Sequence, residues 1–340
     1  MVKANAYGLG MAETVKALEP LDPWGYGVAA VSEGIALREW GVRKTILVCS
    51  PLSPESYSAA VEADLTVSIS DLPGLARLRE AGTAAGRTGR FHLEIDTGMG
   101  RAGLDWQGVE EWGPDVERFI GTGLLWEGVF THFHSADAAD PEPTVRQWKR
   151  LHDALGRLGS RPDDLLVHAC NSPGALRLPE FGGAAVRPGI FLYGGVAGEN
   201  LETPAPVASL RARIVHLKDA RPGATVGYGA TYSARTPERW ATVGIGYGDG
   251  LPRLLSNRGQ ALVRGKRVPI IGRISMDVTV LNITGIPEAE MGDEVTFFGR
   301  AEGGEISLEE VAGNAETINY EVLTGLTQRL PRIWTDDDGY

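Results

Sequence analysis

Over residues 1–190, short apolar runs alternate with longer amphipathic stretches. Continuous apolar runs are typical of parallel strands buried on both faces, and the stretches between them are typical of helices covering such a sheet. The predicted strands span 26–31, 45–49, 65–69, 91–96, 126–132, 165–169 and 184–187, after a first strand reduced to Val2 and Lys3. The predicted helices span 11–18, 33–40, 54–63, 72–81, 109–119, 143–158 and 173–176, with Ser32 as the expected cap of the second and Gly41 as its stop.

Eight strand–helix units in this length of chain are typical of a closed TIM barrel, which usually occupies about 200–250 residues. An open doubly wound sheet is the alternative fold. It is less favoured because no GxGxxG turn follows a predicted strand.

The pattern changes at residues 199–206, a polar segment that contains two prolines. Short apolar runs between Gly, Pro and Asp turns then predict strands at 210–217, 240–246, 260–263, 278–283 and 294–298, with one helix at 308–315. We therefore expect an α/β chain with two domains. Residues 1–206 form a (β/α)8 barrel with a truncated first strand, and residues 207–340 form a mainly β domain.

Composition narrows the possible functions. The net charge of −11, without any basic run, argues against nucleic acid or an anionic membrane as a partner. No apolar run is long enough to span a bilayer, and no signal peptide precedes the first motif. Cys49 and Cys170 each end an apolar run, as expected of reduced buried thiols, and no Cys/His spacing suggests a metal. These features are typical of a soluble globular protein of the cytoplasm.

Polar residues follow several of the predicted strands, where the active site of a TIM barrel lies. Lys3 stands above a glycine-containing turn, a place that suits a Schiff-base lysine near a bound phosphate. Loops after strands seven and eight commonly bind phosphate in such barrels. Two structural alternatives remain open: Ser172 as a plain helix cap, and Arg187 paired with Asp96. The residues expected at this end of the barrel are Lys3, Glu94, Asp96, Arg101, His132, Asn171, Ser172, Arg187, Gly189 and Ile190.

Nine motifs resemble those of the alanine racemases and follow the order of that family. They are VKANAYGLG at 2–10, IDTGMGRAG at 95–103, THFHSAD at 131–137, CNSPGAL at 170–176, VRPGIFLYG at 186–194, VGYGATYSA at 226–234, IGYGDG at 245–250, GRISMD at 272–277 and ETINYE at 316–321. The resemblance implies a fold-type III barrel that binds pyridoxal 5'-phosphate and a homodimer with shared active sites. It also implies interconversion of L- and D-alanine, which supplies D-alanine for peptidoglycan.

The same resemblance implies a role for each matched residue. Lys3 corresponds to the Schiff-base lysine and first base, and Tyr228 to the second base, contributed by the other subunit. Arg187 corresponds to the arginine at the pyridine nitrogen, and His132 to its hydrogen-bond partner. Arg101 and Met276 match positions that hold the substrate carboxylate, and Tyr247 and Asp277 match residues of the substrate entrance. The phosphate-binding positions are Tyr7, Ser172, Gly189, Ile190 and Tyr320, with Asn171 beside them.

The chain departs from the family pattern in three respects. It begins two residues before the lysine, whereas family members begin roughly one strand and one helix earlier, so we expect either a misassigned start or a truncated form. Leu9 stands where histidine is frequent, and Glu94 where many members carry a carbamylated lysine. We expect Glu94 to present its carboxylate to Arg101, or else to pair with another charge at the barrel mouth. Rival functions are a racemase of serine or basic amino acids, a non-catalytic pyridoxal-phosphate-binding protein, which would lack the β domain, and an inactive fragment.

Overall fold

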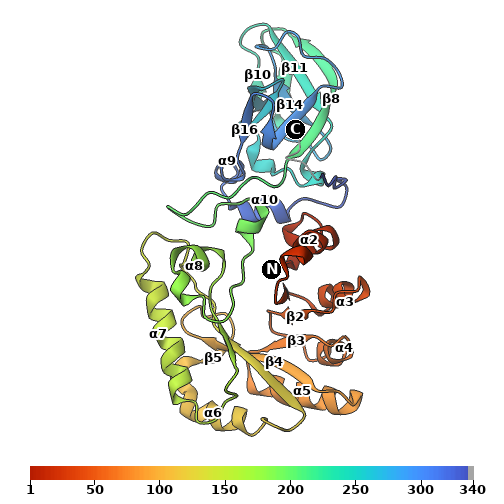
Figure 1. Ribbon diagram of the computed structural model, residues 1–340. Coiled ribbons are helices and arrows are strands. Elements are labelled where there is room, and N and C mark those ends of the chain that lie inside the picture. The colour runs from red at the N-terminus through yellow and green to blue at the C-terminus, as the bar shows by residue number, and fades with distance from the viewer. Residues whose placement is uncertain (336–340) are drawn as a thin grey trace. The chain divides into compact units, whose positions relative to one another are not determined.

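The computed structural model describes residues 1–335, which form two compact units. The barrel unit comprises Met1–Ala6, Met11–Phe191 and Ala197–Glu202. The β unit comprises Tyr7–Gly10, Leu192–Val196 and the chain from Thr203 onward. Each of the two units has its own sheet (Figure 1).

The barrel unit contains a curled parallel sheet with helices packed outside it (Figure 1). Its strands lie in the order β1 (Gly25–Val28), β2 (Thr45–Val48), β3 (Thr66–Ile69), β4 (Gly89–Asp96), β6 (Leu124–Phe130) and β7 (Leu166–His168), and β5 (Leu104–Asp105) pairs with the end of β4. β3 is buried along its whole length, as expected of a strand covered on both faces. The parallel α/β arrangement predicted from the apolar runs is confirmed.

The helices of the barrel unit agree closely with the predicted ones. They are α2 (Met11–Leu18), α3 (Val31–Glu39), α4 (Ser56–Glu62), α5 (Leu72–Ala85), α6 (Val109–Glu117), α7 (Glu142–Arg157) and α8 (Ser172–Arg177). The expected cap of α3 is wrong: the helix begins at Val31, and Ser32 lies inside it. Glu33 replaces that cap, because its carboxylate accepts hydrogen bonds from the amides of Ala29 (2.9 Å) and Ala30 (3.2 Å).

The first and last predicted strands of the barrel are not regular strands in the described chain. Each segment is nevertheless held beside the sheet by backbone hydrogen bonds. The Val2 amide donates to the carbonyl of Gly27 in β1 (2.8 Å), and the Arg187 amide donates to that of Cys170, just beyond β7 (2.9 Å). The nitrogen of Met1 donates to the carbonyl of Pro188 (2.8 Å), so the two segments meet and close the curled sheet.

Lys3 opens a left-handed turn that the sequence did not predict. Residues 3–7 form one helical turn in which Ala4, Asn5 and Ala6 have φ angles of 52°, 53° and 53°. This conformation costs roughly 1–2 kcal/mol for each residue other than glycine, so it persists only where neighbouring groups impose it. The Ala4 amide donates to Glu33 Oε1 (2.6 Å), and Asn5 Oδ1 accepts from the Met11 amide (2.9 Å).

The β unit is an antiparallel sheet that closes on itself. Its strands lie in the order β12 (Gln260–Val263), β13 (Lys266–Ile271), β14 (Thr279–Asn282), β11 (Glu238–Val243), β8 (Leu210–Ala220), β15 (Glu294–Ala301) and β16 (Gly304–Ile306), and β12 also pairs with β15. The hairpin of β9 (Thr225–Val226) and β10 (Tyr232–Ser233) accompanies it, with α9 (Leu308–Asn314) and α10 (Asn319–Thr324). The sequence analysis missed β9, β10, β13, β16 and α10.

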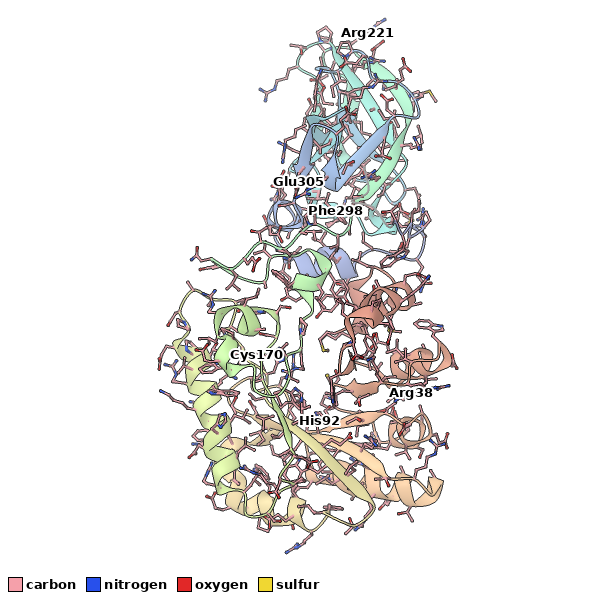
Figure 2. The ribbon with its side chains drawn as sticks, viewed as in Figure 1. Arg38, His92, Cys170, Arg221, Phe298 and Glu305 are labelled. Atoms are coloured by element: carbon pink, nitrogen blue, oxygen red, sulfur yellow. The ribbon has the colours of Figure 1, made fainter. Side chains whose placement is uncertain are left out.

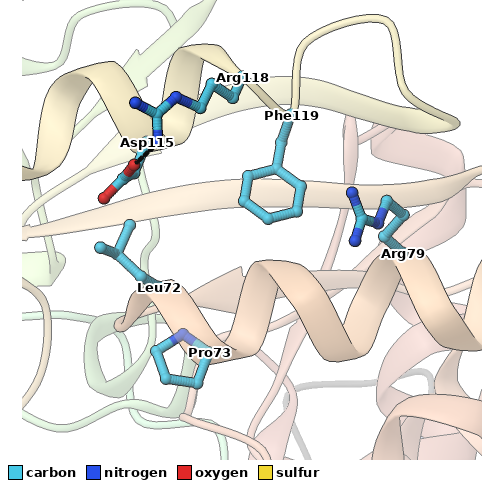
Figure 3. A pocket seen from close by; sticks show the side chains of 6 residues that line it. All are labelled: Leu72, Pro73, Arg79, Asp115, Arg118 and Phe119. Carbon is cyan, nitrogen blue, oxygen red and sulfur yellow. Dashed lines mark hydrogen bonds and ion pairs between the residues drawn. The ribbon is translucent and has the colours of Figure 1, made fainter.

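A hollow of about 430 Å³ lies between α5 and the end of α6, among the helices outside the sheet (Figure 3). Its polar lining is partly engaged already, since Arg118 donates to Asp115 (2.5 Å) and Arg79 lies 5.1 Å from the ring centre of Phe119. None of the residues expected in the active site lines it. Among residues 1–335, no helix has the length and apolarity needed to cross a bilayer.

Candidate active site

The residues expected in the active site divide between the two units. The barrel unit carries Lys3, Glu94, Arg101, His132, Asn171, Ser172, Arg187, Gly189 and Ile190. The β unit carries Tyr7, Tyr228, Tyr247, Met276, Asp277 and Tyr320.

Arg187 is the centre of a hydrogen-bond network at the ends of β6 and β7. Its Nη2 donates to the carbonyls of Thr131 and Ala169, both at 2.9 Å, and lies 3.3 Å from Nδ1 of His132. Its Nη1 lies 2.6 Å from Nδ1 of His168. The partnership of Arg187 with His132, which the resemblance implies, is therefore present in the structure, and His168 is a second imidazole partner.

The imidazoles around Arg187 are neutral. Burial lowers the pKa of His132 to about 3, and the positive charges of Arg187, Arg101 and Lys3 lower it further. Burial likewise lowers the pKa of His168 well below its ordinary value, and that of His92 to about 3, with Arg187 adding to both effects. His92 and Cys170 are labelled in Figure 2. Neutral rings can accept hydrogen bonds from the guanidinium, which itself only donates.

Ser172 and Gly189 meet at the start of α8. The Gly189 amide donates to Ser172 Oγ at 2.8 Å, and both residues are buried. Asn171 is the cap of α8, since its side chain accepts from the Gly174 amide at 3.1 Å. The alternative of Ser172 as a plain helix cap is therefore wrong. Its hydroxyl proton remains able to donate to an anion at this helix start.

Glu94 lies at the carboxyl end of β4 and is buried, with 5% of its surface exposed. Its Oε2 accepts a hydrogen bond from the Ser70 hydroxyl at 2.7 Å. The expected direct pair of Glu94 with Arg101 is absent from the contacts of residues 1–335. The alternative pair of Arg187 with Asp96 is absent too, because Asp96 instead accepts from the amides of its own loop. Burial raises the pKa of Glu94, while the Ser70 hydroxyl and the charges of Arg101 and Arg187 oppose that rise.

In the β unit, three tyrosines lie together. The rings of Tyr7 and Tyr193 stack with centres 4.7 Å apart, and those of Tyr7 and Tyr320 are 6.1 Å apart. Gly8 lets this segment approach α10: its φ is +88°, and a Cβ there would lie 2.2 Å from the Leu323 carbonyl oxygen. Arg332 holds the same segment by donating to the Gly8 carbonyl at 2.8 Å. Two expected phosphate-binding tyrosines are thus brought together.

Tyr228 stands in the turn between β9 and β10, with 71% of its surface exposed. Asn257 fixes that turn, since its amide donates to Thr231 Oγ1 (3.1 Å) and its Oδ1 accepts from the Gly272 amide (2.6 Å).

The segments that carry Tyr247 and Met276 run side by side. The Gly248 amide donates to the Met276 carbonyl at 2.8 Å, and the Tyr247 amide donates to that of Ser275 at 3.0 Å. The side chain of Asp277 accepts from Arg329 at 2.8 Å. Within the β unit, the structure therefore brings Met276, expected to hold the substrate carboxylate, together with Tyr247 and Asp277, expected at the substrate entrance.

Family models for the N-terminal and C-terminal domains of alanine racemase match residues 1–197 and 207–334. The chain belongs to the alanine racemase family. It is 37% identical to the alanine racemase of Desulfosudis oleivorans and 38% identical to alanine racemase 2 of Bacillus subtilis. The alignments cover 98% and 99% of this chain, and 88% of each relative.

Solved structures agree with this membership. The alanine racemase from D-cycloserine-producing Streptomyces lavendulae has a TM-score of 0.92 and 35% identity, covering 99% of this chain and 90% of that one. The alanine racemase of Bacillus anthracis, whose structure contains bound L-Ala-P, has a TM-score of 0.90 and 32% identity, covering 99% of this chain and 88% of that one. The fold predicted from the sequence, a barrel followed by a mainly β domain, is confirmed.

Several residues of this alanine racemase site escaped the sequence analysis. His168 and Ser70 lie on or beside neighbouring strands, and Tyr193 lies inside a motif that was quoted for other residues. His92 is two residues before Glu94 on the same strand, so the period-two alternation could have placed both on one face.

The side chains of the barrel unit suit pyridoxal phosphate. A hydroxyl and a helix start at Ser172 suit a phosphate, Arg187 supplies a planar donor for a ring nitrogen, and Lys3 supplies an amine for an aldehyde. Among residues 1–335, no group of three or more His, Cys, Asp and Glu side chains is arranged to hold a metal.

The raised pKa of Glu94 predicts a pH-dependent stability difference. Ionised Glu94 is less favourable in the folded chain than in the unfolded one, so its destabilising effect is absent below the ordinary glutamate pKa of about 4.3 and complete above the raised pKa. Glu94→Gln should therefore gain stability relative to the wild type as pH rises above about 4, and the gain should level off above the raised pKa of Glu94. Denaturant unfolding across that range measures the difference.

Ser70→Ala is the matched control for this measurement. Ser70→Ala removes the hydroxyl that opposes the rise in the pKa of Glu94. In chains that carry Ser70→Ala, the stability gained by adding Glu94→Gln should therefore depend more strongly on pH. A difference that stays constant with pH contradicts the raised pKa.

Proposed function

We propose that this chain interconverts L- and D-alanine with bound pyridoxal phosphate, and that Lys3 and Tyr228 are its two bases. The observation that carries the proposal is the placement of Lys3. It opens a left-handed turn whose Ala4 amide donates to Glu33, in the unit whose strand ends also carry Arg187 and Ser172. A lysine on a backbone fixed in this way can present its amine for covalent attachment of an aldehyde cofactor.

Five residues would hold the phosphate of the cofactor. Ser172, Gly189 and Ile190, with Tyr7 and Tyr320, bind the phosphate, and Asn171 holds the start of α8 beside them. When bound, the cofactor withdraws electrons from the substrate and thereby acidifies the proton on its Cα. Arg187 would donate a hydrogen bond to the ring nitrogen and would keep its own proton, because a guanidinium is not deprotonated in proteins. The ring nitrogen would therefore stay largely unprotonated, and electron withdrawal by the ring would be limited. This limit disfavours side reactions such as transamination.

Racemisation requires a proton to leave one face of Cα and to return on the other. Two bases on opposite faces meet that requirement, so Lys3 Nζ acts on one face and Tyr228 Oη on the other. Arg101 and Met276 would hold the substrate carboxylate, and Tyr247 and Asp277 would line the substrate entrance.

We propose further that the enzyme is a homodimer in which Tyr228 serves the partner's site. Tyr228 and Met276 are exposed to 71% and 52% on the β unit, unusual values for a base and a substrate contact that must work away from water. A partner subunit covering them would give that environment. The two cysteines are free, which fits a reducing cytoplasm, and supply of D-alanine for peptidoglycan is the proposed role.

Lys3→Ala tests the activity and the first base together. The variant should lose the visible absorbance of covalently held pyridoxal phosphate and lose D-alanine formation by roughly 10²–10⁴-fold or more. Lys16→Ala is the control, because Lys16 is an exposed lysine whose only ion pair in residues 1–335 joins it to Glu13 on the same helix. Parallel assays with L-serine and L-lysine measure substrate breadth. Intact racemisation by the Lys3 variant excludes the assignment.

A mixing experiment tests the shared site. Lys3→Ala and Tyr228→Phe chains, each inactive alone, should recover part of the activity when subunits exchange, because one of the two hybrid sites then contains both bases. Exchange is followed by differently tagged chains. Demonstrated exchange without any recovery means that Lys3 and Tyr228 act within one chain.

Glu94→Gln tests whether this carboxylate supplies the charge that carbamylated lysine supplies in other family members. Glu94 acts on Arg101 through its charge rather than by contact, so Gln should raise the KM for alanine more than it lowers kcat. Activity of the wild type should not depend on bicarbonate. Unchanged kcat and KM in the Gln variant refute the role.

A further inference from the structure

Two histidines extend the Arg187 network into the interior of the barrel unit. His92 on β4 and His168 on β7 are 0% and 2% exposed. Nδ1 of His92 lies 2.8 Å from Nε2 of His168, and Nδ1 of His168 lies 2.6 Å from Arg187 Nη1. Figure 2 labels His92 among the strands of this unit. The three side chains form one continuous row from β4 to the end of the barrel.

The charged group at one end of the row fixes the protons of the whole row. A guanidinium only donates, so Nδ1 of His168 must accept, and a neutral His168 then carries its proton on Nε2. That N–H donates to Nδ1 of His92, which must also be unprotonated. His92 therefore carries its proton on Nε2, the nitrogen that has no hydrogen-bond partner among residues 1–335.

The neighbouring strand makes room for this row. β6 lies between β4 and β7, and Gly128 of β6 stands opposite His92. A Cβ at Gly128 would lie 2.6 Å from both Nδ1 and Cε1 of the His92 ring, so any side chain there would displace the imidazole. Phe130, also on β6, stacks on the His168 ring at 5.1 Å and lies under the Arg187 guanidinium at 5.3 Å. β6 thus leaves space for the His92 ring at Gly128 and packs against the His168 ring through Phe130.

We propose that His92 is a positioning residue for the racemase. By accepting the His168 N–H, it fixes the tautomer and plane of His168, which in turn aims the Arg187 guanidinium. This inference rests on the proposed function, in which Arg187 faces the ring nitrogen of the cofactor. A buried imidazole with an unpartnered N–H destabilises the folded chain. The hydrogen bond that His92 accepts from His168 gives a functional reason for an imidazole at this position.

His92→Asn and His92→Leu form a matched pair for the test. The two side chains have nearly the same size and shape, and both leave the same space where the rest of the imidazole was. Asn can place Oδ1 near the position of Nδ1 and accept from His168, whereas Leu cannot. Any difference between the variants therefore reports the hydrogen bond rather than the cavity.

The chains are loaded with pyridoxal phosphate and assayed with L-alanine beside the wild type. His92→Leu should lower kcat by about 10-fold or more with a smaller change in KM, the size expected when a supporting hydrogen bond to a functional group is lost. It should also shift the visible absorption maximum of the bound cofactor, and His92→Asn should restore both properties toward the wild type. Equal kcat and equal spectra in the two variants overturn the positioning role.

Tautomers measured by ¹⁵N NMR give a second readout that needs neither variant nor activity. In the wild-type chain, His168 and His92 should both carry their proton on Nε2. A proton on Nδ1 of His168 overturns the proposal even if both variants fail to fold. A wild type that makes no D-alanine refutes the proposed function, whereas an active wild type with indistinguishable Asn and Leu variants refutes only the role of His92.

Discussion

The guanidinium of Arg187 is a cation held by neutral acceptors, and the carboxyl ends of β6 and β7 owe their arrangement to it. Two carbonyls, of Thr131 and Ala169, and Nδ1 of His168 receive its hydrogen bonds. A buried charge is expensive unless its donors are satisfied, so each of these groups is constrained to stay where it is. Because no carboxylate forms an ion pair with Arg187 among residues 1–335, its charge is not neutralised by a partner in contact.

Glu94 is a buried carboxylate, and it too needs a hydrogen-bond partner. Its carboxylate takes a hydroxyl donor from Ser70 rather than either arginine, and it acts on Arg101 and Arg187 through space. In the proposed function Arg101 holds the substrate carboxylate, and a direct pair with Glu94 would compete for the same donors. Charge at a distance lets Glu94 moderate two cations without occupying their hydrogen-bond donors.

Much of the fold could be predicted because apolar periodicity is a local property. α2 and β12 have the predicted bounds, and the other main helices of the barrel unit shift only at their ends. What failed depends on distant partners. β13 contains Pro269 and two charged residues, so its identity as a strand comes from pairing with β12 and β14. The left-handed turn after Lys3 was equally hidden, since Ala4 and Ala6 have no preference for it and Glu33, far along the chain, imposes it.

Site residues that belong to a sequence motif could be predicted, whereas site residues that are placed by strand register could not. A register shift in the pairing of β4 with β6 follows Phe91, which is opposite Trp126, so that His92 faces Gly128. Without the shift, His92 would face Glu127, whose carboxylate here binds Arg90 and Thr66. A carboxylate beside that imidazole would favour its protonated form, and a protonated His92 could not accept from His168. The one-residue irregularity in β6 therefore keeps the row beneath Arg187 neutral, a consequence visible only once the strands are paired.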